Sequence, residues 1–344
     1  MDASPLRSAL QQLSQGQRLS RVEAAAAFAV IMEGGATPAQ SGALLLGLRA
    51  RGETSDELAG AAEALRSAMV PLPVENRDAL VDTCGTGGGK IGTVNLSTAA
   101  AFIVAGAGVP VAKHGNRSYT SKSGSADVLE ALGIDISSSA EESLELLQSV
   151  GFAFLFAPNY HPAMRHLALV RKELGVATIM NLLGPLVNPA GVQRQIVGVS
   201  DVARAPLVAA ALGELGATHA LVLHAPAGMD EISPVGCTHV WEVKEGQIRQ
   251  WELNPAQYGL DCEDIRGLAG GEPGYNAKEI ERLLDGHGNA ALRCAALLNA
   301  AAALYVANKG WSFDEAVKRA TRALESGAAA AVLDRLRATA ARRM

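Results

Sequence analysis

The sequence has few aromatic residues, no long apolar run and no export signal. Aromatic residues make up 4% of the chain, while alanine, leucine and glycine are abundant, which is typical of a soluble protein whose helices pack on sheets. The N-terminus, MDASPLRSAL, shows no basic stretch followed by an apolar one, and no apolar run approaches the ~20 residues of a membrane span. We expect a cytoplasmic protein that does not contact a membrane.

Cysteine pairs and excess positive charge are also missing. The four cysteines, at positions 84, 237, 262 and 294, include no CxxC pair, so neither a disulfide framework nor a cysteine-bound metal is expected. The formal net charge of −5 argues against a broad nucleic-acid surface. Any anion site must therefore be local.

The chain divides into a helical segment and a longer segment in which strands and helices alternate. In residues 1–70, capping boxes at Ser20–Glu23 and Thr54–Glu57 and the pair Thr37-Pro38 each open a predicted helix. From Ala79 onward, apolar runs such as ALVDTC, VPVAK, FAFLF, QIVGV and ALVLH alternate with helical patterns. This order predicts an α/β protein, with a small all-helical N-terminal domain and a large domain whose mainly parallel central sheet is flanked by helices.

Two stretches interrupt the alternation. Residues 162–190 form a helical insert that we expect to complete the small domain, so that residues 71–161 and 191–344 form the large α/β domain. Residues 238–253 predict a β-hairpin. The N-terminal helices are too short to enclose a core alone, so they should pack against another unit, for which a second copy of the chain is one option.

Residues 84–98, CGTGGGKIGTVNLST, place a glycine-rich turn between a predicted strand and a predicted helix. Glycine backbone lets several N–H groups converge on phosphate oxygens, and the helix N-terminus adds its dipole. A dinucleotide fingerprint fits Gly87-x-Gly89-x-x-Gly92 formally, but the next strand ends in Lys113-His114 where that site needs an acid. An ATPase P-loop fails because Ile91 stands where Ser or Thr is required. Polar residues after the glycines remain open as ligand contacts or helix caps: Asn95, Ser97 and Thr98.

Residues 111–127, VAKHGNRSYTSKSGSAD, place basic, hydroxyl and amide side chains after the next predicted strand. Ligands of open α/β sheets bind at the carboxyl ends of such strands, and the glycine loop ends the neighbouring strand. Phosphate binding is therefore favoured over a merely solvated loop. Ser125 could instead cap the following helix.

Two other groups could act at the same edge. Asp230-Glu231 follow the strand ALVLH and could hold Mg²⁺ beside the phosphate loops, or be a solvated acidic pair. In the insert, Met164, Ala168 and Arg171 share one helix face, where the arginine could pair with the carboxylate of a flat apolar ligand or lie along the surface. His161 is equally consistent with capping, packing or function. Since no nucleophilic triad stands out, the pattern indicates a site that clamps charge.

Together, the blocks GTGGGKIGTVNLST, VAKHGNRSYTSKSGSADVLEALG, HPAMRHLALVRKELGVATIMNLLGPLVNPAG and GMDEIS resemble the anthranilate phosphoribosyltransferase family, in order and over nearly the whole chain. The resemblance implies transfer of the phosphoribosyl group from 5-phosphoribosyl 1-diphosphate (PRPP) to the amine of anthranilate, with release of diphosphate, in tryptophan synthesis. It also implies Mg²⁺ as cofactor and a homodimer joined through the small helical domain.

Carried over position by position, the resemblance assigns residues to each ligand. The donor residues are Gly85, Gly88, Gly89, Thr93, Asn95, Leu96, Ser97, Thr98, Lys113, His114, Gly115, Asn116, Arg117, Ser118, Tyr119, Thr120, Ser121 and Ser125. The anthranilate residues are Gly85, Asn116 and Arg171. The metal residues are Ser97, Asp230 and Glu231. Weaker candidates for the acceptor channel are His114, which is also the one weak acid–base candidate, and Pro185.

The glycine loop departs from the family pattern at one place. The family usually reads GTGGDG, whereas this chain reads GTGGGK, so Gly89 replaces an acid and Lys90 replaces a glycine. We expect altered metal affinity or loop mobility, with Lys90 partly substituting as a diphosphate contact.

Two other functions compete with this prediction. A pyrimidine-nucleoside phosphorylase would carry a longer C-terminal domain and lack the NLLGPLVNP block. A non-enzymatic relative that binds nucleic acid would show a basic face and a degraded substrate site.

Overall fold

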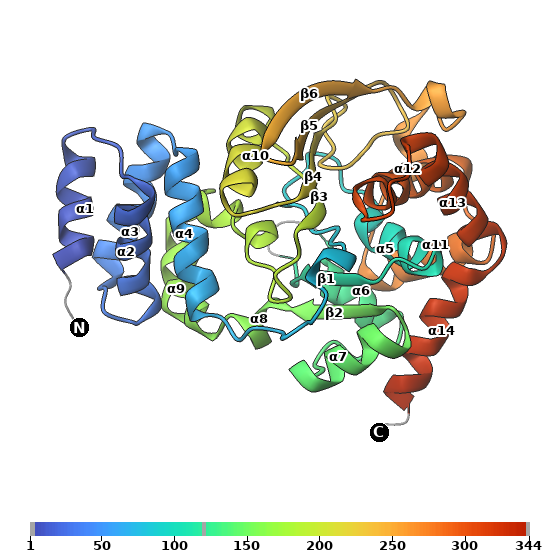
Figure 1. The fold of residues 1–344 in the computed structure, drawn as a ribbon, viewed down its shortest axis with the longest axis horizontal. Helices are drawn as coiled ribbons and strands as arrows, with labels where there is room; N and C mark the ends of the chain where they lie inside the picture. The colour runs from blue at the N-terminus through green and yellow to red at the C-terminus, as the bar shows by residue number, and fades with distance from the viewer. Residues whose placement is uncertain (1–3, 119–121, 342–344) are drawn as a thin grey trace.

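The computed structural model describes residues 4–118 and 122–341. Figure 1 shows the N-terminal helices at one end of the molecule, the sheet in the middle and the C-terminal helices at the other end. The N-terminal helices are α1 (Ser4–Ser14), α2 (Arg21–Met32), α3 (Pro38–Arg51) and α4 (Ser55–Ala68). Helices α2, α3 and α4 begin at the predicted caps, where Ser20, Thr37 and Thr54 each accept a hydrogen bond from the third helical N–H.

The helical insert packs on these N-terminal helices. Its main helix, α9 (Arg165–Leu174), contacts α2 and α3, and Leu167 and Val170 are buried in the same apolar cluster as Leu44 and Leu45. Shorter elements complete it: η2 (Pro162–Met164), η3 (Ile179–Asn181) and η4 (Gly184–Leu186), while α8 (Ala157–Tyr160) directly precedes it. The N-terminal helices also pack against α10 (Ala205–Glu214), which contacts α4.

The central sheet consists of a two-stranded part and a four-stranded part, with two parallel and two antiparallel strand pairings. Its strands are β1 (Val111–Gly115), β2 (Phe152–Phe156), β3 (Arg194–Gly198), β4 (His219–His224), β5 (Thr238–Lys244) and β6 (Gln247–Leu253). Strand β1 pairs with β2 and β3 with β4 in parallel, whereas β5 and β6 form the predicted antiparallel hairpin beside β4. The hairpin turns at Glu245 and Gly246, both with positive φ, which matches the twist of the two strands.

Val81 and Asp82 join β1 to β3. The Val81 N–H donates to Pro110 and the Asp82 N–H to Arg194, so this segment lies between the two strands. The predicted strand ALVDTC is thereby reduced to two bridging residues. Its pairing stops because the Cys84 N–H donates to the Asp82 side chain, after which the chain enters the glycine loop.

Helices cover the sheet and form the second end of the molecule (Figure 1). They are α5 (Leu96–Gly106), α6 (Ser125–Ala131), α7 (Ala140–Ser149), α11 (Pro273–Leu284), α12 (Ala290–Val306), α13 (Phe313–Glu325) and α14 (Ala328–Ala341). Helix α5 packs against α12, α13 and α14, and α12 is buried along most of its length. Short 3₁₀ turns connect the rest: η1 (Arg77–Ala79), η5 (Val202–Arg204), η6 (Pro255–Tyr258) and η7 (Ile265–Leu268). Within residues 4–118 and 122–341, no helix is both long and apolar enough to cross a membrane.

Candidate active site

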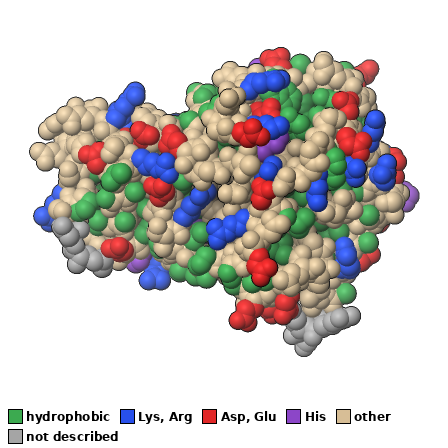
Figure 2. Space-filling model, viewed as in Figure 1, with side chains coloured by type: hydrophobic (Ala, Val, Ile, Leu, Met, Phe, Trp, Pro, Cys, Tyr) green, Lys and Arg blue, Asp and Glu red, His purple; other side chains and the backbone are tan. Residues whose placement is uncertain are grey.

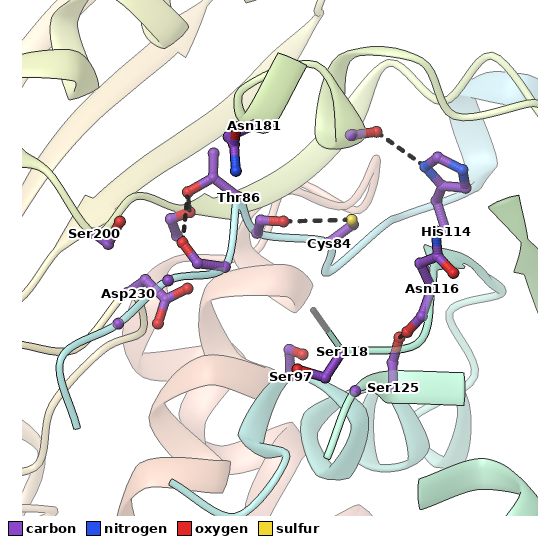
Figure 3. A pocket seen from close by; sticks show the side chains of 18 of the residues that line it. Cys84, Thr86, Ser97, His114, Asn116, Ser118, Ser125, Asn181, Ser200 and Asp230 are labelled. Atoms are coloured by element: carbon purple, nitrogen blue, oxygen red, sulfur yellow. Dashed lines mark hydrogen bonds between the residues drawn. The ribbon is translucent and has the colours of Figure 1, made fainter. Parts of the chain in front are cut away.

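A cavity of about 1240 Å³ lies between the helical insert and the carboxyl ends of the parallel strands. A site for one small molecule usually measures roughly 300–1,000 Å³, so this cavity has room for two substrates. Figure 3 shows Asp230 and Ser200 on one side and His114 and Asn116 on the other, with Ser97 between them. Loops that are far apart in the sequence thus face a common space.

Most of the predicted site residues line this cavity. They are Gly85, Gly88, Gly89, Thr93, Asn95, Ser97, Lys113, His114, Gly115, Asn116, Arg117, Ser118, Ser125, Arg171, Asp230 and Glu231. Leu96 and Thr98 have side chains buried in the core, so only their backbone at the start of α5 lies near the ligand loops. Pro185 is buried in η4 and is absent from the described wall. Tyr119, Thr120 and Ser121 fall outside the described residues.

The glycine loop is anchored at two points and turns between them. Thr86 donates to the Gly198 carbonyl through both its N–H (2.8 Å) and its hydroxyl (3.1 Å), and the Lys90 N–H donates to Gly228 (2.9 Å). Gly87 and Gly88 have φ values of 70° and 86°, which side chains disfavour. The loop therefore presents backbone rather than side chains to the cavity.

Helix capping is excluded as the role of the polar residues beside this loop. Asn95 occupies the cap position of α5, but no capping bond forms within the described chain. Its amide instead donates to Ser123 and accepts from Asn276 (2.8 Å). Ser97 lies inside the helix, and Ser125 is the first residue of α6, where its hydroxyl donates to a backbone carbonyl.

Lys113 places a buried positive charge beneath the loop. It is 1% exposed, and its Nζ donates to the Thr83 hydroxyl (3.0 Å) and to the Ser97 hydroxyl (3.3 Å). Burial lowers the pKa of Lys113, while the charges of Asp82 and Glu231 raise it. A buried cation that faces polar oxygens is suited to attract an anionic ligand.

Arg117, in contrast, is already paired. Its guanidinium donates to Asp127 (3.0 Å) and to Glu130 (2.5 and 2.8 Å) on α6. Its side chain therefore fixes the loop to α6, because both acids engage its donors.

His114 and His161 form a neutral pair on the opposite wall, with ring centroids 5.1 Å apart. Burial lowers the pKa of His114 to about 3 and that of His161 to about 4. His114 Nδ1 lies 2.9 Å from the Gly184 carbonyl, and the ring of His161 bonds the Val187 carbonyl. A nitrogen bonded to a carbonyl must carry the proton, and each Nε2 lacks a partner among the described residues. Each ring therefore offers an unpaired acceptor.

Helix α9 and the η2 turn before it supply the predicted face to the same cavity. Met164, Ala168 and Arg171 all line it. The helix ends three residues after Arg171 and is followed by Gly175, whose φ of 63° is typical of a helix C-terminus. This wall combines apolar surface with one guanidinium.

Asp230 and Glu231 leave β4 through a turn closed by a hydrogen bond from the Ala225 N–H to the Met229 carbonyl (3.1 Å). Burial raises the pKa of both carboxyl groups, and their mutual repulsion raises that of Glu231 further. Two crowded acids would be stabilised by a cation. Among the described residues, no group of three His, Cys, Asp or Glu side chains forms a protein-only metal site. Mg²⁺ suits this pattern, since it binds through one or two carboxylates together with substrate phosphates and water.

Gly89 explains how the departure from the family motif is accommodated. A β-carbon at position 89 would clash with Asp230 Oδ1, and the backbone angle there is an ordinary one, so space is the constraint. The Gly87 N–H also bonds to the Asp230 carboxyl group. The Asp230 side chain thus occupies the place of a residue-89 side chain. The Lys90 side chain is exposed at the cavity wall.

Several lining residues have no motif that would have revealed them. Ser200 lies beside Gly88 in the loop after β3, Asn181 lies in the insert, and Asn276 at the start of α11 bonds to Asn95. Each is a single polar residue in a loop or near a helix end. Figure 2 shows Lys and Arg side chains mixed with acidic ones, without a continuous basic face on the side in view.

The comparisons with known proteins agree with this geometry. Residues 77–330 match the glycosyl transferase family a/b domain, and residues 7–69 match the family's helical bundle domain. The fold and the site thus define a two-domain glycosyl transferase. The chain belongs, within that class, to the anthranilate phosphoribosyltransferase family.

Relatives of that name cover nearly the whole chain. The protein from Rubrobacter xylanophilus is 49% identical over 332 residues, which are 96% of each chain. That from Anaeromyxobacter dehalogenans (strain 2CP-C) is 48% identical over 324 residues, 94% of this chain and 95% of the relative. The crystal structure of anthranilate phosphoribosyltransferase from Thermus thermophilus superposes with a TM-score of 0.91 at 43% identity, covering 96% of this chain and 99% of that one. The Saccharomyces cerevisiae enzyme in complex with PRPP and Mg gives a TM-score of 0.88 at 28% identity, with 99% of both chains covered.

The buried neutral state of His161 predicts a pH effect on stability. Its pKa is about 4 in the folded protein, against 6.5 for an ordinary histidine, so the unfolded chain binds more protons between these values. Stability should therefore fall as the pH drops from 7 to 5, by about 2 kcal/mol from this residue. In urea unfolding at both pH values, His161→Gln should lose less stability than the wild type.

His287→Gln is the matched control, because His287 is exposed on the surface. It should reproduce the wild-type pH dependence. If His161→Gln does so as well, the imidazole is not held neutral in the folded protein.

Proposed function

We propose that the cavity transfers the phosphoribosyl group from PRPP to the amine of anthranilate, releasing diphosphate, as a step of tryptophan biosynthesis. One observation carries this proposal: a single cavity joins a charged wall, made by the glycine loop and Lys113, to the apolar wall of α9 with Arg171. Family membership supports it, as do structures of the yeast relative with PRPP and Mg and with 4-fluoroanthranilate.

The donor binds along the glycine loop and the start of α5. Backbone N–H groups and Lys113 would neutralise the negative charge that develops on the leaving diphosphate. The loop after β1 would hold the ribose 5-phosphate, where Asn116 and Ser118 line the cavity. The placement of Tyr119, Thr120 and Ser121 at the donor remains a prediction from the sequence.

Mg²⁺ is the proposed cofactor, held by Asp230, Glu231 and the Ser97 hydroxyl. When bound, it would neutralise diphosphate charge. The Ser97 oxygen accepts from Lys113 and keeps a second lone pair for a cation. The raised pKa of both carboxyl groups supports the assignment, because a cation would relieve their crowding.

Anthranilate binds on the other side, with its carboxylate at Arg171 and its ring against Met164 and Ala168. Gly85 and Asn116 lie toward the donor. The amine is neutral at pH 7, so its attack needs no strong base, and His114 with a pKa of about 3 acts as a hydrogen-bond acceptor. The geometry supports direct displacement, with inversion and without a covalent intermediate.

Replacing Arg171 tests the acceptor site. Arg171→Ala should raise the KM for anthranilate about 10- to 100-fold, because a charge-assisted hydrogen bond contributes about 1.5–3 kcal/mol. The KM for PRPP should change little. Both values can be measured from the loss of anthranilate fluorescence in the presence of PRPP and Mg²⁺, with a metal chelator as the zero-activity reference.

Lys172→Ala is the control for this variant, because Lys172 is the exposed neighbour of Arg171 on α9. It should leave both KM values unchanged. An equal rise in the two KM values for Arg171→Ala would contradict the assignment of the anthranilate carboxylate.

Gly89 offers a test of the acidic pair. Gly89→Ala should push the Asp230 carboxylate away from the loop and raise the Mg²⁺ concentration for half-maximal activity about 10-fold, as displaced metal-site partners commonly do. Gly274→Ala is the control, since Gly274 is absent from the described cavity wall and no described atom beyond its chain neighbours lies within 4 Å of a β-carbon there. An unchanged Mg²⁺ requirement in Gly89→Ala would count against metal binding by Asp230.

We further place the protein in the cytoplasm, as a homodimer joined through its helical end. Leu46 on α3 and Leu169 on α9 are 48% and 59% exposed, on helices that pack against each other. We infer that the two leucines belong to one apolar patch across these helices, and an exposed apolar patch marks an association surface. The free state of all four cysteines agrees with a reducing compartment.

The double substitution Leu46→Glu with Leu169→Glu should convert the dimer to a monomer in analytical ultracentrifugation. Two buried charges at such an interface cannot be paired. Ile248→Glu is the control, because Ile248 is 47% exposed on β6, in the sheet. A monomeric wild type, or a dimer that survives the double substitution, would refute this surface.

A further inference from the structure

Helix α12 carries a buried amide among alanines and leucines. Asn299 is 1% exposed, and its neighbours Leu298, Ala300 and Ala301 are fully buried. A buried amide destabilises a core unless hydrogen bonds compensate for its lost contacts with water. The partners of Asn299 therefore show what this residue does.

The amide pairs with both backbone groups of one residue, Ile232. Asn299 Oδ1 accepts from the Ile232 N–H (3.0 Å), and Nδ2 donates to the Ile232 carbonyl (3.0 Å). The second Nδ2 hydrogen stays within the helix and bonds to the Ala295 carbonyl (2.9 Å). This is the two-point contact that a neighbouring strand would make, supplied by a side chain.

Ile232 directly follows Glu231, so the acidic pair is held from both sides. Before the pair, the Ala225–Met229 bridge fixes the chain to the end of β4. The Asp230 backbone also packs closely against Gly198, where an added β-carbon would overlap the Asp230 carbonyl oxygen. After the pair, the hydrogen bonds between Asn299 and Ile232 join the chain to α12. Glu231 is the acid next to these bonds.

We propose that Asn299 is a positioning residue that holds Glu231 in place to bind the metal. The proposal rests on the proposed function, in which Asp230 and Glu231 bind Mg²⁺. Asn299 and Glu231 both line the cavity. The residue after Ile232 is held separately, because the Ser233 N–H donates to the Thr238 hydroxyl. That bond anchors the following loop but not the peptide beside Glu231.

Asn299→Ser gives the sharpest test. A serine in a helix can still bond to the carbonyl four residues earlier, here Ala295, but it is too short to pair with Ile232. Direct binding of Mn²⁺, used as a paramagnetic substitute for Mg²⁺, should be measured on the full chain by electron paramagnetic resonance, with and without PRPP. We expect the Mn²⁺ affinity to fall about 10-fold, the lower range for loss of a group that orients a metal ligand. Asn299→Leu, which keeps the branched shape of the side chain but removes its hydrogen-bonding atoms, should give the same loss.

Leu304→Ala is the matched control, because Leu304 is fully buried in α12 and absent from the described cavity wall. It should lower the melting temperature and leave the Mn²⁺ affinity unchanged. Native Mn²⁺ affinity in both Asn299 variants overturns the proposal, as does an equal loss of affinity in Leu304→Ala. Glu231→Gln distinguishes failure of the metal assignment from failure of the role of Asn299. If this variant binds Mn²⁺ like the wild type, the metal assignment fails. If it loses the ion while the Asn299 variants keep it, only the role of Asn299 fails.

Discussion

The buried carboxylate of Asp82 accepts hydrogen bonds from three segments that are far apart in the sequence. Its Oδ1 accepts from the N–H groups of Cys84 (3.0 Å) and His114 (3.2 Å), and its Oδ2 accepts from Asn188 (2.7 Å). These contacts join the glycine loop, the end of β1 and the helical insert. Burial raises the pKa of Asp82 to about 6, while Lys113 and the hydrogen bonds favour the ionised form. Without this carboxylate, the buried Lys113 would lose the negative charge that most favours its ionised form, which is destabilising. The cavity therefore depends on Asp82, although Asp82 does not line it.

This arrangement divides the cavity into a charged wall and a neutral wall. Lys113 lies between the carboxylates of Asp82 and Glu231, so positive charge is kept beneath the glycine loop. On the other side, His114 and His161 are kept neutral by burial, and both turn a protonated nitrogen toward the backbone of the insert. The charged wall suits the highly charged donor, and the neutral wall suits the neutral amine of the acceptor. Because residues 113 and 114 are adjacent on β1 and alternate across it, one short strand supplies both walls.

The elements that were predicted correctly from the sequence have local causes. Capping boxes, the β-hairpin and the shared face of Met164, Ala168 and Arg171 depend on residues within a few positions of each other. The differences arise where partners come from distant segments. The Asn95 side chain does not cap α5, because its amide is hydrogen-bonded to Ser123 and Asn276. The Arg117 side chain pairs with two acids on α6. The spacing of residues in a single sequence does not show which distant side chain will form a hydrogen bond or ion pair with a given residue. These roles could therefore be assigned only from the structure.

The change at Gly89 and Lys90 alters the balance among the remaining acids. Relative to the usual family motif, the loop loses one negative charge and gains one positive charge. Asp230 fills the space beside Gly89, so one carboxylate still lies against the loop, contributed by another segment. A carboxylate on its own strand turn has less freedom than one on a glycine-rich loop, because the Ala225–Met229 bridge and the packing against Gly198 fix its backbone. Because fewer acids lie near the loop than in the usual family motif, a cation site there depends more on the fixed position of each remaining acid. The geometry of this acidic pair is thus set by β4 and α12, outside the loop that the motif describes.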